Sequence, residues 1–450
     1  MKYWVDWKKV MFNDTIYALS SGSGICAISL IRCSGNLVPL LLEKLFTKDL
    51  SNVQPRKAIY AHAKDEQGII DDVVVTYFKA PATYTGEDLL EISTHGSPLI
   101  RQRLYVALQH LGLRLARNGE FSQRAVLNGK MTLAQAEGVN DMIHAKSNTA
   151  YQIAYQAANG SIARIVAPIY DAALQLQAHI NVNIDYPEYE DIEQLTQSTI
   201  LPQLIQLQSQ LNQLIQVSNR CLNIVQGVKT VIVGKPNVGK SSLLNALLNE
   251  NKAIVTDIAG TTRDVVEGEI MIGDLYLKLL DTAGIREGGS MIEQMGIEKS
   301  KELIEQAQCV IMVVAKANGY DNDDEIIYNL VKDKQAIIVN NKCEQVTDDR
   351  LLNISAATNH IQPLIHAIEE KFANFDFDYD ATLTNARQIS SANNALESLN
   401  IMIDQCNALV PIDLIELEMQ NFVFSLKEIG GEAIQEDLLD RIFASFCVGK

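Results

Sequence analysis

The order of apolar and polar residues changes its character several times along the chain. Over the first 130 or so residues, short apolar runs alternate with turns, as in Ile25–Ile31, Ala58–His62 and Asp72–Phe78. Pro81 and the Tyr84–Gly86 turn follow the last of these runs. Runs rich in β-branched residues and bounded by glycine and proline are typical of β-strands. The pattern predicts a compact α+β domain over residues 1–130.

From residue 131 the apolar positions take the spacing of amphipathic helices, in sequence rich in alanine and glutamine. Leu204, Leu207, Leu211 and Leu214 follow one another at steps of three, four and three residues. These steps place the four leucines on one face of a helix. Such a stripe is far more often the core of a helix bundle than a cofactor site, so we predict the first part of a helical domain over residues 131–226.

A third pattern begins at residue 227, where apolar runs alternate with helical segments. Continuous apolar runs are typical of parallel strands that are buried on both faces, and the intervening segments are then crossover helices. Helical periodicity returns after Phe375 and continues to Lys450. We therefore predict an α/β domain at 227–375, inserted into a helical domain whose second part is 376–450. The expected strands are Thr230–Val233, Tyr276–Leu280, Val310–Val314 and Ala336–Val339.

A glycine-rich segment, Gly234–Ser241, follows the first of these strands and reads Gly-Lys-Pro-Asn-Val-Gly-Lys-Ser. Glycines let the backbone approach phosphates, and successive N–H groups at a helix start bind the anion. Lys240 would reach the outer phosphates, and the Ser241 hydroxyl would hold Mg²⁺. With a strand before it and a helix after it, the segment predicts a phosphate-binding loop.

Further motifs lie downstream in a fixed order: Gly260–Asp264, Asp281–Gly284, Asn341–Glu344 and Ser355–Ala357. Each is weak alone, but together they resemble the five sequence elements of a small GTPase domain. Thr262 would be a second Mg²⁺ ligand. We expect GTP to be bound by Asn237, Val238, Gly239, Lys240, Ser241, Ser242, Gly260, Thr261, Thr262, Asp281, Thr282, Ala283, Gly284, Asn341, Lys342, Glu344, Ser355 and Ala356.

One position departs from the pattern of Ras-like GTPases. A glutamine normally follows the Asp-Thr-Ala-Gly glycine and orients the attacking water. Ile285 stands there and cannot do so. Glu293 is the candidate catalytic replacement. From the residues alone, an exposed helix carboxylate is an equally good interpretation of Glu293.

Composition limits the location and the partners of the chain. Its formal net charge of −17 disfavours a broad nucleic-acid surface, so any RNA contact must be local. No apolar run approaches the roughly 18 residues of a membrane span, and the segment Met1–Met11 lacks the apolar core of a secretory signal. The seven cysteines form no CxxC pair, which is typical of a reducing compartment. We predict a cytoplasmic protein with no membrane partner.

Taken together, the motifs resemble those of the bacterial tRNA modification GTPase family MnmE (TrmE) over nearly the whole chain. Gly119–Ser122 and the terminal Phe446–Lys450 are peculiar to this family, so the resemblance is specific. Residues Met1–Val10 have no counterpart in the family pattern, which makes Met11 an alternative start. The other matching stretches are Thr85–Asp88, Leu133–Glu137, Met295–Glu298 and the GTPase elements.

The resemblance implies an N-terminal folate-binding domain that mediates homodimerisation, a helical domain, and an inserted Ras-like P-loop GTPase domain. It also implies an FAD-dependent partner, MnmG (GidA), with FAD bound only by that partner. The two proteins would add an aminomethyl-type group (carboxymethylaminomethyl) to C5 of the wobble uridine of certain tRNAs. The one-carbon unit would come from a tetrahydrofolate derivative, 5-formyl or methylene. GTP hydrolysis would drive a conformational change and not the carbon chemistry.

The resemblance also assigns individual residues. Glu293 falls on the family's water-orienting glutamate. K⁺ would be held by Asn237, Thr256, Ile258 and Thr261, between two facing GTPase domains, and Asp257 and Ala259 of the same loop would also contact the nucleotide. The folate ligands would be Arg32, Glu91, Lys130 and Lys450, because a pterin needs a carboxylate and a glutamyl tail needs cations.

Two other classes of protein would share part of this sequence pattern. A ribosome-assembly GTPase, acting as an RNA-binding timer, would share the GTPase elements but has no use for the N-terminal domain. A free-standing folate-dependent transferase with a regulatory GTPase is the other alternative.

Glu344 replaces the aspartate that normally reads guanine, which predicts weaker guanine binding. Cys447 is expected to be packed on a C-terminal helix and not to be a nucleophile.

Overall fold

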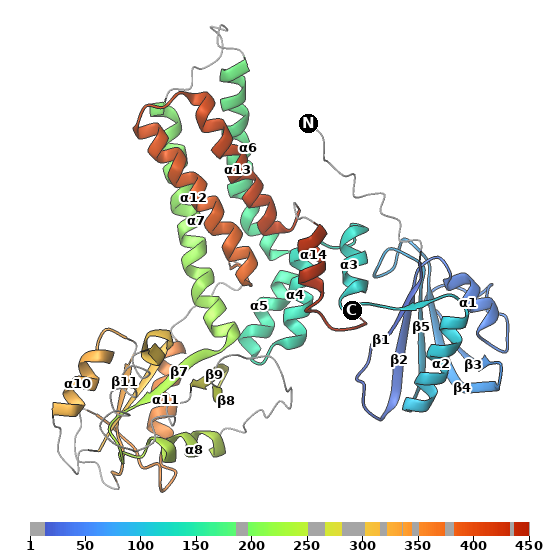
Figure 1. The fold of residues 1–450 in the computed structure, drawn as a ribbon, viewed down its shortest axis with the longest axis horizontal. Coiled ribbons are helices and arrows are strands. Elements are labelled where there is room, and N and C mark those ends of the chain that lie inside the picture. Colours follow the sequence, from blue (N-terminus) through green and yellow to red (C-terminus); the bar gives the residue numbers. More distant parts are fainter. Residues whose placement is uncertain are drawn as a thin grey trace. The chain divides into compact units, whose positions relative to one another are not determined.

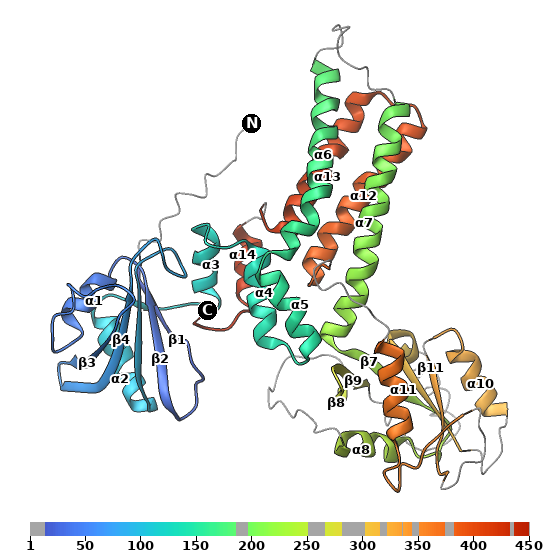
Figure 2. The same ribbon diagram turned by 180° about the vertical axis from the view of Figure 1, so that it is seen from behind.

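The computed structural model (Figure 1) describes residues 14–185, 197–250, 266–280, 302–315, 322–334, 336–343, 351–373, 382–432 and 436–449. Figure 2 shows the same ribbon from behind. The chain divides into two compact units. The first comprises Met1–Asn140, Ala158–Ala163 and Val423–Lys450, and the second comprises Asp141–Ala157 and Arg164–Phe422. Each unit has its own six-stranded sheet.

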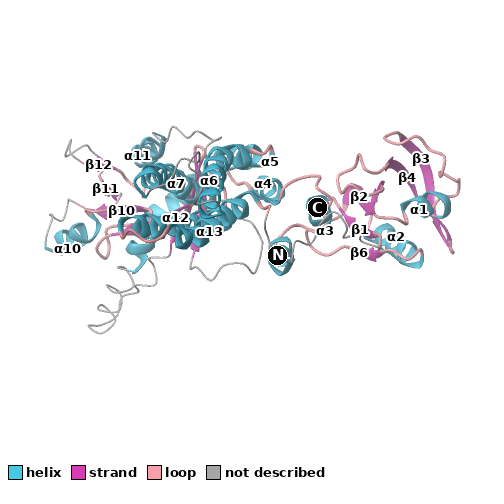
Figure 3. Ribbon diagram, turned by 90° about the horizontal axis from the view of Figure 1, so that it is seen from above, coloured by secondary structure: helices cyan, strands magenta, loops and turns pink. Residues whose placement is uncertain are grey.

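The sheet of the first unit has the order β3-β4-β5-β2-β1-β6, and its pairs are antiparallel except for the parallel pair β1–β6. Alternate strand residues such as Ile31, Val75 and Ile92 pack under helices α1 (Val38–Lys44) and α2 (Pro98–His110), which Figure 3 colours cyan beside the magenta strands. The α+β prediction is confirmed. The strands are β1 (Ile16–Leu19), β2 (Cys26–Ser34), β3 (Ala58–Asp65), β4 (Gly68–Phe78), β5 (Leu89–Gly96) and β6 (Arg114–Leu115).

The C-terminal segment of the chain packs onto helices α3 (Glu120–Leu127) and α4 (Leu133–His144) of the same unit. Helix α14 (Glu436–Phe443) contacts α3, and Phe443 and Phe446 share a core with Leu133 of α4. At Gly119 the backbone is left-handed (φ +64°), and a Cβ there would lie 2.6 Å from the Phe443 carbonyl oxygen. A glycine is therefore required where these two distant segments meet.

Two buried charged residues of α3, Glu120 and Arg124, belong to an ion cluster that joins this helix to its neighbours. Arg124, whose side chain is fully buried, donates to Asp14, Glu87 and Glu120, and Arg114 also binds Glu120. Burial by itself would raise the pKa of Glu120, but hydrogen bonds from Arg114, from the Arg117 backbone and from Arg124 lower it to about 2. The cluster therefore keeps Glu120 ionised in the folded domain over most of the acid range.

Long helices form most of the helical part of the chain. The Leu204–Leu214 stripe lies on α7, where all four leucines are buried, so its assignment to a bundle core is confirmed. Helix α7 packs against α12, and the Ser218 hydroxyl accepts a bond from the Leu383 N–H. No described helix is long and apolar enough to cross a membrane. The helices are α5 (Asn148–Ala158), α6 (Ser161–Asp185), α7 (Gln197–Gln226), α12 (Ala386–Asn407) and α13 (Ile412–Gly430).

The sheet of the second unit has the order β12-β11-β10-β7-β9-β8. Its pairs are parallel except for β8, which runs antiparallel to β9 at the edge, so the predicted, mostly parallel α/β domain is confirmed. The strands are β7 (Val228–Val233), β8 (Val266–Ile272), β9 (Leu275–Leu280), β10 (Cys309–Val314), β11 (Ala336–Asn340) and β12 (Leu352–Asn353), and the described helices are α8 (Lys240–Glu250), α10 (Asn322–Val331) and α11 (Gln362–Ala373).

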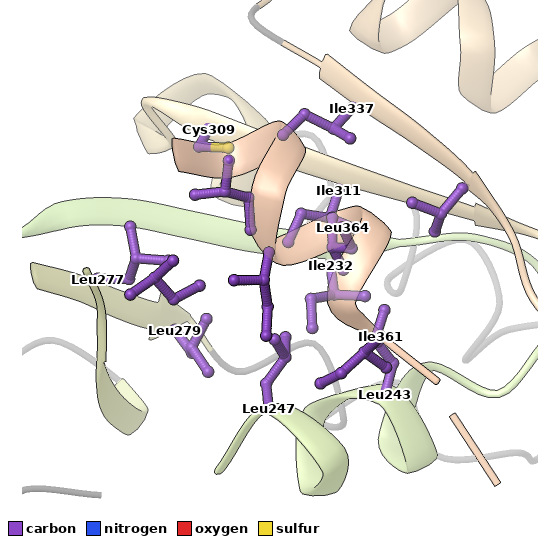
Figure 4. Packing of buried hydrophobic residues seen from close by; sticks show 14 of the residues in the cluster. Ile232, Leu243, Leu247, Leu277, Leu279, Cys309, Ile311, Ile337, Ile361 and Leu364 are labelled. Carbon is purple, nitrogen blue, oxygen red and sulfur yellow. The ribbon is translucent and has the colours of Figure 1, made fainter. Parts of the chain in front are cut away.

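Both faces of this sheet are buried, which explains its continuous apolar runs. On one face, Leu243 and Leu247 of α8 and Leu364 of α11 pack against strand residues such as Ile232 and Ile311 (Figure 4). The opposite face is covered by a second cluster that includes residues from β7, β10 and α10. The core therefore fixes the carboxyl ends of the parallel strands, and the loops that follow these ends carry the predicted motifs.

Candidate nucleotide-binding site

The Gly234–Gly239 loop joins β7 to α8 and has the backbone of an anion-binding turn. Gly234 (φ +152°) lies so close to β10 that a Cβ would be 2.3 Å from the Val313 carbonyl oxygen. Gly239 (φ +96°) would bring a Cβ within 2.3 Å of the Asn341 Nδ2 atom. Asn237 between them is also left-handed, at φ +63°. The two glycines are thus required by contact as well as by conformation, and the loop ends at the start of a helix, where N–H groups are free to bind anions.

Lys240 begins α8 and turns back over this loop. Its Nζ atom donates to the carbonyl oxygens of Gly234 and Lys235, each at 2.8 Å. Burial lowers the pKa of the Lys240 ammonium. The next two residues, Ser241 and Ser242, are exposed on the first turn of α8. A hydroxyl oxygen in that place is the kind of donor that Mg²⁺ prefers, so the predicted ligand Ser241 fits a hard cation.

Asn341 links two loops that the sequence predicted separately. Its Nδ2 atom donates to the Val238 carbonyl oxygen at 2.8 Å, and its Oδ1 atom accepts from the Ala356 N–H at 3.0 Å. Lys342, with φ +64°, donates from Nζ to the Asn237 carbonyl oxygen at 2.6 Å. The structure therefore brings three of the predicted elements together at the ends of β7, β11 and β12.

A cavity of about 450 Å³ lies between α8 and the loop after β12. Ser355 and His360 close this loop with two backbone hydrogen bonds of 3.0 and 2.9 Å. The volume is within the range of small-molecule sites. The three asparagines in its wall were not among the predicted site residues, although two of them stand four residues apart on the helix that follows the phosphate loop. The lining residues are Ser242, Asn245, Ala246, Asn249, Ala356, Ala357 and Asn359.

Several predicted residues lie outside the described ranges, and their placement stays a prediction. They belong to the loop Thr256–Thr262, to Asp281–Gly284, and to the single positions Glu293, Glu344 and Lys450. The described part of the site therefore comprises the phosphate loop, Asn341, Lys342 and the Ser355–Ala356 turn.

In the first unit, Arg32 and Glu91 face each other across strands β2 and β5. The Arg32 guanidinium donates from Nη2 and Nε to the Glu91 Oε1 atom at 2.8 and 3.1 Å, and the two side chains are only 17 % and 23 % exposed. The rings of Tyr84 and Phe121 lie 5.5 and 5.9 Å from the guanidinium carbon. A cation, a carboxylate and aromatic rings thus lie together on the sheet face opposite α1 and α2.

The end of the chain reaches the same region. The Gly449 carbonyl oxygen accepts from the Ser20 hydroxyl at 3.0 Å and from Arg32 Nη1 at 3.4 Å. Lys130 donates to the Pro81 carbonyl oxygen at 2.9 Å, in the loop that also holds Tyr84. Three of the four predicted folate ligands are therefore described, and two of them are in direct contact.

One expectation about this segment was wrong. Cys447 is exposed and follows the end of α14, so it is not packed on a C-terminal helix. Its carbonyl oxygen accepts a bond from the Gly119 N–H at 3.3 Å, which fixes the backbone and leaves the thiol at the surface. The helical periodicity predicted for this part of the chain runs to Lys450, but α14 ends at Phe443.

Two protein-family models together match most of the chain. The family model described as "GTP-binding protein TrmE N-terminus" matches residues 15–130, and "MnmE helical domain" matches residues 133–447. The tRNA modification GTPase MnmE of Streptococcus mutans is 38% identical over 97% of this chain and 99% of its own length. That of Lactococcus lactis is 39% identical over 97% of this chain and 98% of its own length.

Among solved structures, Era of Aquifex aeolicus bound to GDP·AlF₄⁻ is 28% identical, with a TM-score of 0.27 over 38% of this chain and 66% of its own. A TM-score this low does not bear on function. The two family models and the nearly full-length relatives do, and they leave the ribosome-assembly alternative without support. The chain belongs to the MnmE family of tRNA modification GTPases.

Proposed function

We propose that GTP hydrolysis by this chain depends on K⁺ and on dimerisation, and that it serves the modification of the wobble uridine of certain tRNAs. The proposal that the chain binds GTP rests on the two hydrogen bonds of Asn341, one to the phosphate loop and one to the Ser355–Ala356 turn. Phosphates and base must contact these two loops at the same time. Their direct connection supports a single nucleotide site that spans both.

Two cations belong to this proposal. Mg²⁺ would be held by Ser241 and Thr262, and K⁺ by Asn237, Thr256, Ile258 and Thr261 when two GTPase domains face each other. K⁺ would supply positive charge near the transferring phosphoryl group, where an arginine acts in other GTPases. Asn237 suits this role because it is exposed and its left-handed backbone lies within the phosphate loop.

Glu293 would orient the attacking water, since Ile285 cannot. Glu344 would accept hydrogen bonds from guanine. Its carboxylate is carried one methylene further out than that of the usual aspartate, so we expect weaker guanine binding with the preference over adenine retained. The base would enter the cavity beside α8, whose volume is within the range of small-molecule sites.

We further propose that Arg32, Glu91, Lys130 and Lys450 bind a tetrahydrofolate derivative, 5-formyl or methylene, which supplies the one-carbon unit. The half-buried Arg32–Glu91 pair and the neighbouring rings provide the donors, acceptors and flat surfaces that a pterin requires. Binding would require Glu91 to exchange part of its bond with Arg32 for bonds to the pterin. The same domain would form the homodimer.

The partner in this scheme is an FAD-dependent protein of the MnmG (GidA) type, which alone binds FAD. Together the two proteins would add the carboxymethylaminomethyl group to C5 of the uridine. A reducing, cytoplasmic location is also part of this proposal, in which none of the seven cysteines would form a disulfide. With a net charge of −17, contact with tRNA would be local or would rest on the partner.

Nucleoside mass spectrometry of tRNA tests the proposal. Cells that lack the chain should lose the modified wobble uridine, and wild-type chain should restore it. Lys240→Ala should fail because the phosphate contact is lost, whereas Lys44→Ala, in an exposed ion pair of α1, should restore it fully. Unchanged wobble uridines in the deletion strain would contradict the proposal.

A further inference from the structure

Within the second unit, a lysine from the helical part of the chain binds the edge of the α/β sheet. Lys146 lies between α4 and α5, and its Nζ atom donates to Glu269 Oε2 and to the Tyr276 hydroxyl, each at 2.6 Å. The ammonium also lies 4.7 Å from the centre of the Tyr276 ring. One cation therefore bonds to both strands of the β8–β9 hairpin.

The alternation of the hairpin explains why these two side chains meet Lys146. Ile270 and Ile272 of β8 and Leu275, Leu277 and Leu279 of β9 lie in the core under α8 and α11, and the residues that alternate with them along each strand point to the opposite face. Glu269 on β8 pairs with Lys278 on β9, and Tyr276 stands two residues before Lys278 on the same face. The contact is thus a fixed consequence of strand register and not of a flexible loop in the sheet.

The cluster is sheltered, so its bonds are worth more than those of a surface ion pair. Tyr276 is 2 % exposed, and Lys146 and Glu269 are 32 % and 23 % exposed. Burial alone would raise the pKa of Glu269, but hydrogen bonds from Lys146 and Tyr276 and the charges of Lys146 and Lys278 lower it. Without Lys146, a half-buried carboxylate would lose its closest cation.

Tyr276 also contacts the point where the helical part enters the sheet. Gly227 joins α7 to β7 with φ +94°, and a Cβ there would lie 2.4 Å from the Tyr276 Cδ1 atom. The aromatic ring therefore rests directly on the backbone at the start of β7. The same strand ends at Val233, and Gly234 of the phosphate loop follows directly.

We infer that Lys146 is a positioning residue for GTP hydrolysis, which it serves by holding the β8–β9 hairpin against the loop between α4 and α5. Strand β9 ends at Leu280, directly before Asp281, and β8 begins at Val266, shortly after Thr262. Both predicted residues are thus joined to the hairpin by a short stretch of backbone, through which Lys146 would act on them. The inference rests on the family's GTPase activity and does not require the proposed K⁺ or folate sites.

The test is steady-state GTP hydrolysis by the full-length chain at one protein concentration, together with GDP-analogue titration and thermal unfolding. Lys146→Ala should lower kcat by about tenfold, since sub-ångström misplacement of catalytic groups is costly. The Kd for the nucleotide should change by less than about twofold, because Lys146 contacts none of the described phosphate-loop residues. Lys146→Arg should restore most of kcat. Lys44→Ala is the matched control, with an exposed lysine–glutamate pair.

A double-mutant cycle separates positioning from general destabilisation. Glu269→Gln should lower kcat as Lys146→Ala does, and the double variant should be no slower than either single variant, because the two residues act through one contact. Wild-type kcat in Lys146→Ala would overturn the inference. So would additive losses in the cycle, or a loss of kcat that follows the fall in melting temperature in all variants, Lys146→Arg included.

Discussion

Asn341→Ala should weaken nucleotide binding strongly, because this side chain joins the two loops that the nucleotide would contact. The substitution removes two buried hydrogen bonds, one to the Val238 carbonyl oxygen and one from the Ala356 N–H. The loss of each bond leaves a buried partner unsatisfied, which costs about 1–3 kcal/mol. The two costs are not fully additive, so the connection between the loops should lose roughly 2–4 kcal/mol of free energy. Nucleotide binding needs both loops in place, and it must therefore supply this energy.

A loss of that size corresponds to GDP affinity that is roughly 30- to 700-fold weaker, since 1.4 kcal/mol is a factor of ten. Equilibrium titration with a fluorescent GDP analogue measures it. Asn341→Asp should not rescue binding, because it keeps the acceptor for Ala356 but sets an oxygen against the Val238 carbonyl. Asn183→Ala, which removes one exposed side-chain bond to a helix carbonyl, is the control. Affinity within twofold of wild type in a folded Asn341→Ala chain would refute the reasoning.

Four further outcomes are expected. Hydrolysis should be faster in KCl than in NaCl at equal ionic strength, and equal rates in both salts would remove the role of K⁺. Glu293→Ala should slow turnover while nucleotide affinity stays nearly constant. Calorimetry should show a reduced folate binding to the chain, with Arg32→Ala or Glu91→Ala weakening it by about 1–3 kcal/mol, and no binding to wild type would end the folate proposal. Glu344→Asp should tighten GDP binding by about 0.5–1.5 kcal/mol in the same fluorescence titration, and weaker binding would show that the loop already fits glutamate. The pKa of Glu120 is lowered to about 2, so its ion cluster should stabilise the fold fully above the unfolded pKa of about 4.3 and lose that effect as pH falls through about 2. In urea unfolding between pH 6 and pH 2, the stability of Glu120→Gln should therefore depend less on pH than that of the wild type. Identical slopes for the two proteins would contradict the assignment.

Sequence periodicity predicted the parts of the fold whose burial repeats along the chain. The leucine stripe of α7 and the continuous apolar runs of β7, β10 and β11 are examples, because helix and parallel-strand burial leave regular patterns. Strand β8 was missed because Gly268 and Glu269 interrupt its apolar residues, and an edge strand with one exposed face needs no continuous run.

Contacts between distant segments were beyond sequence reasoning. Arg32 and Glu91 were assigned to a folate site through the family resemblance, but their pairing depends on the register of β2 against β5, which no local pattern encodes. The same holds for Lys146, an ordinary surface lysine in the sequence whose partners lie 123 and 130 residues away. The strand, glycine-rich turn and helix around Gly234–Ser241, in contrast, could be predicted from the sequence, because this arrangement depends on residues that are adjacent in the chain.

The contact of Gly449 with Arg32 sets an order of events during synthesis. The two residues are 417 positions apart, so at about 5–20 residues per second the ribosome needs roughly 20–80 s to deliver the second after the first. The α/β sheet of β7–β12, by contrast, draws on one continuous stretch that is complete by Ala373. A growing chain can therefore complete its phosphate loop while Arg32 still lacks its last neighbours. Premature termination after α12 would yield a product with the phosphate loop but without the completed Arg32 cluster.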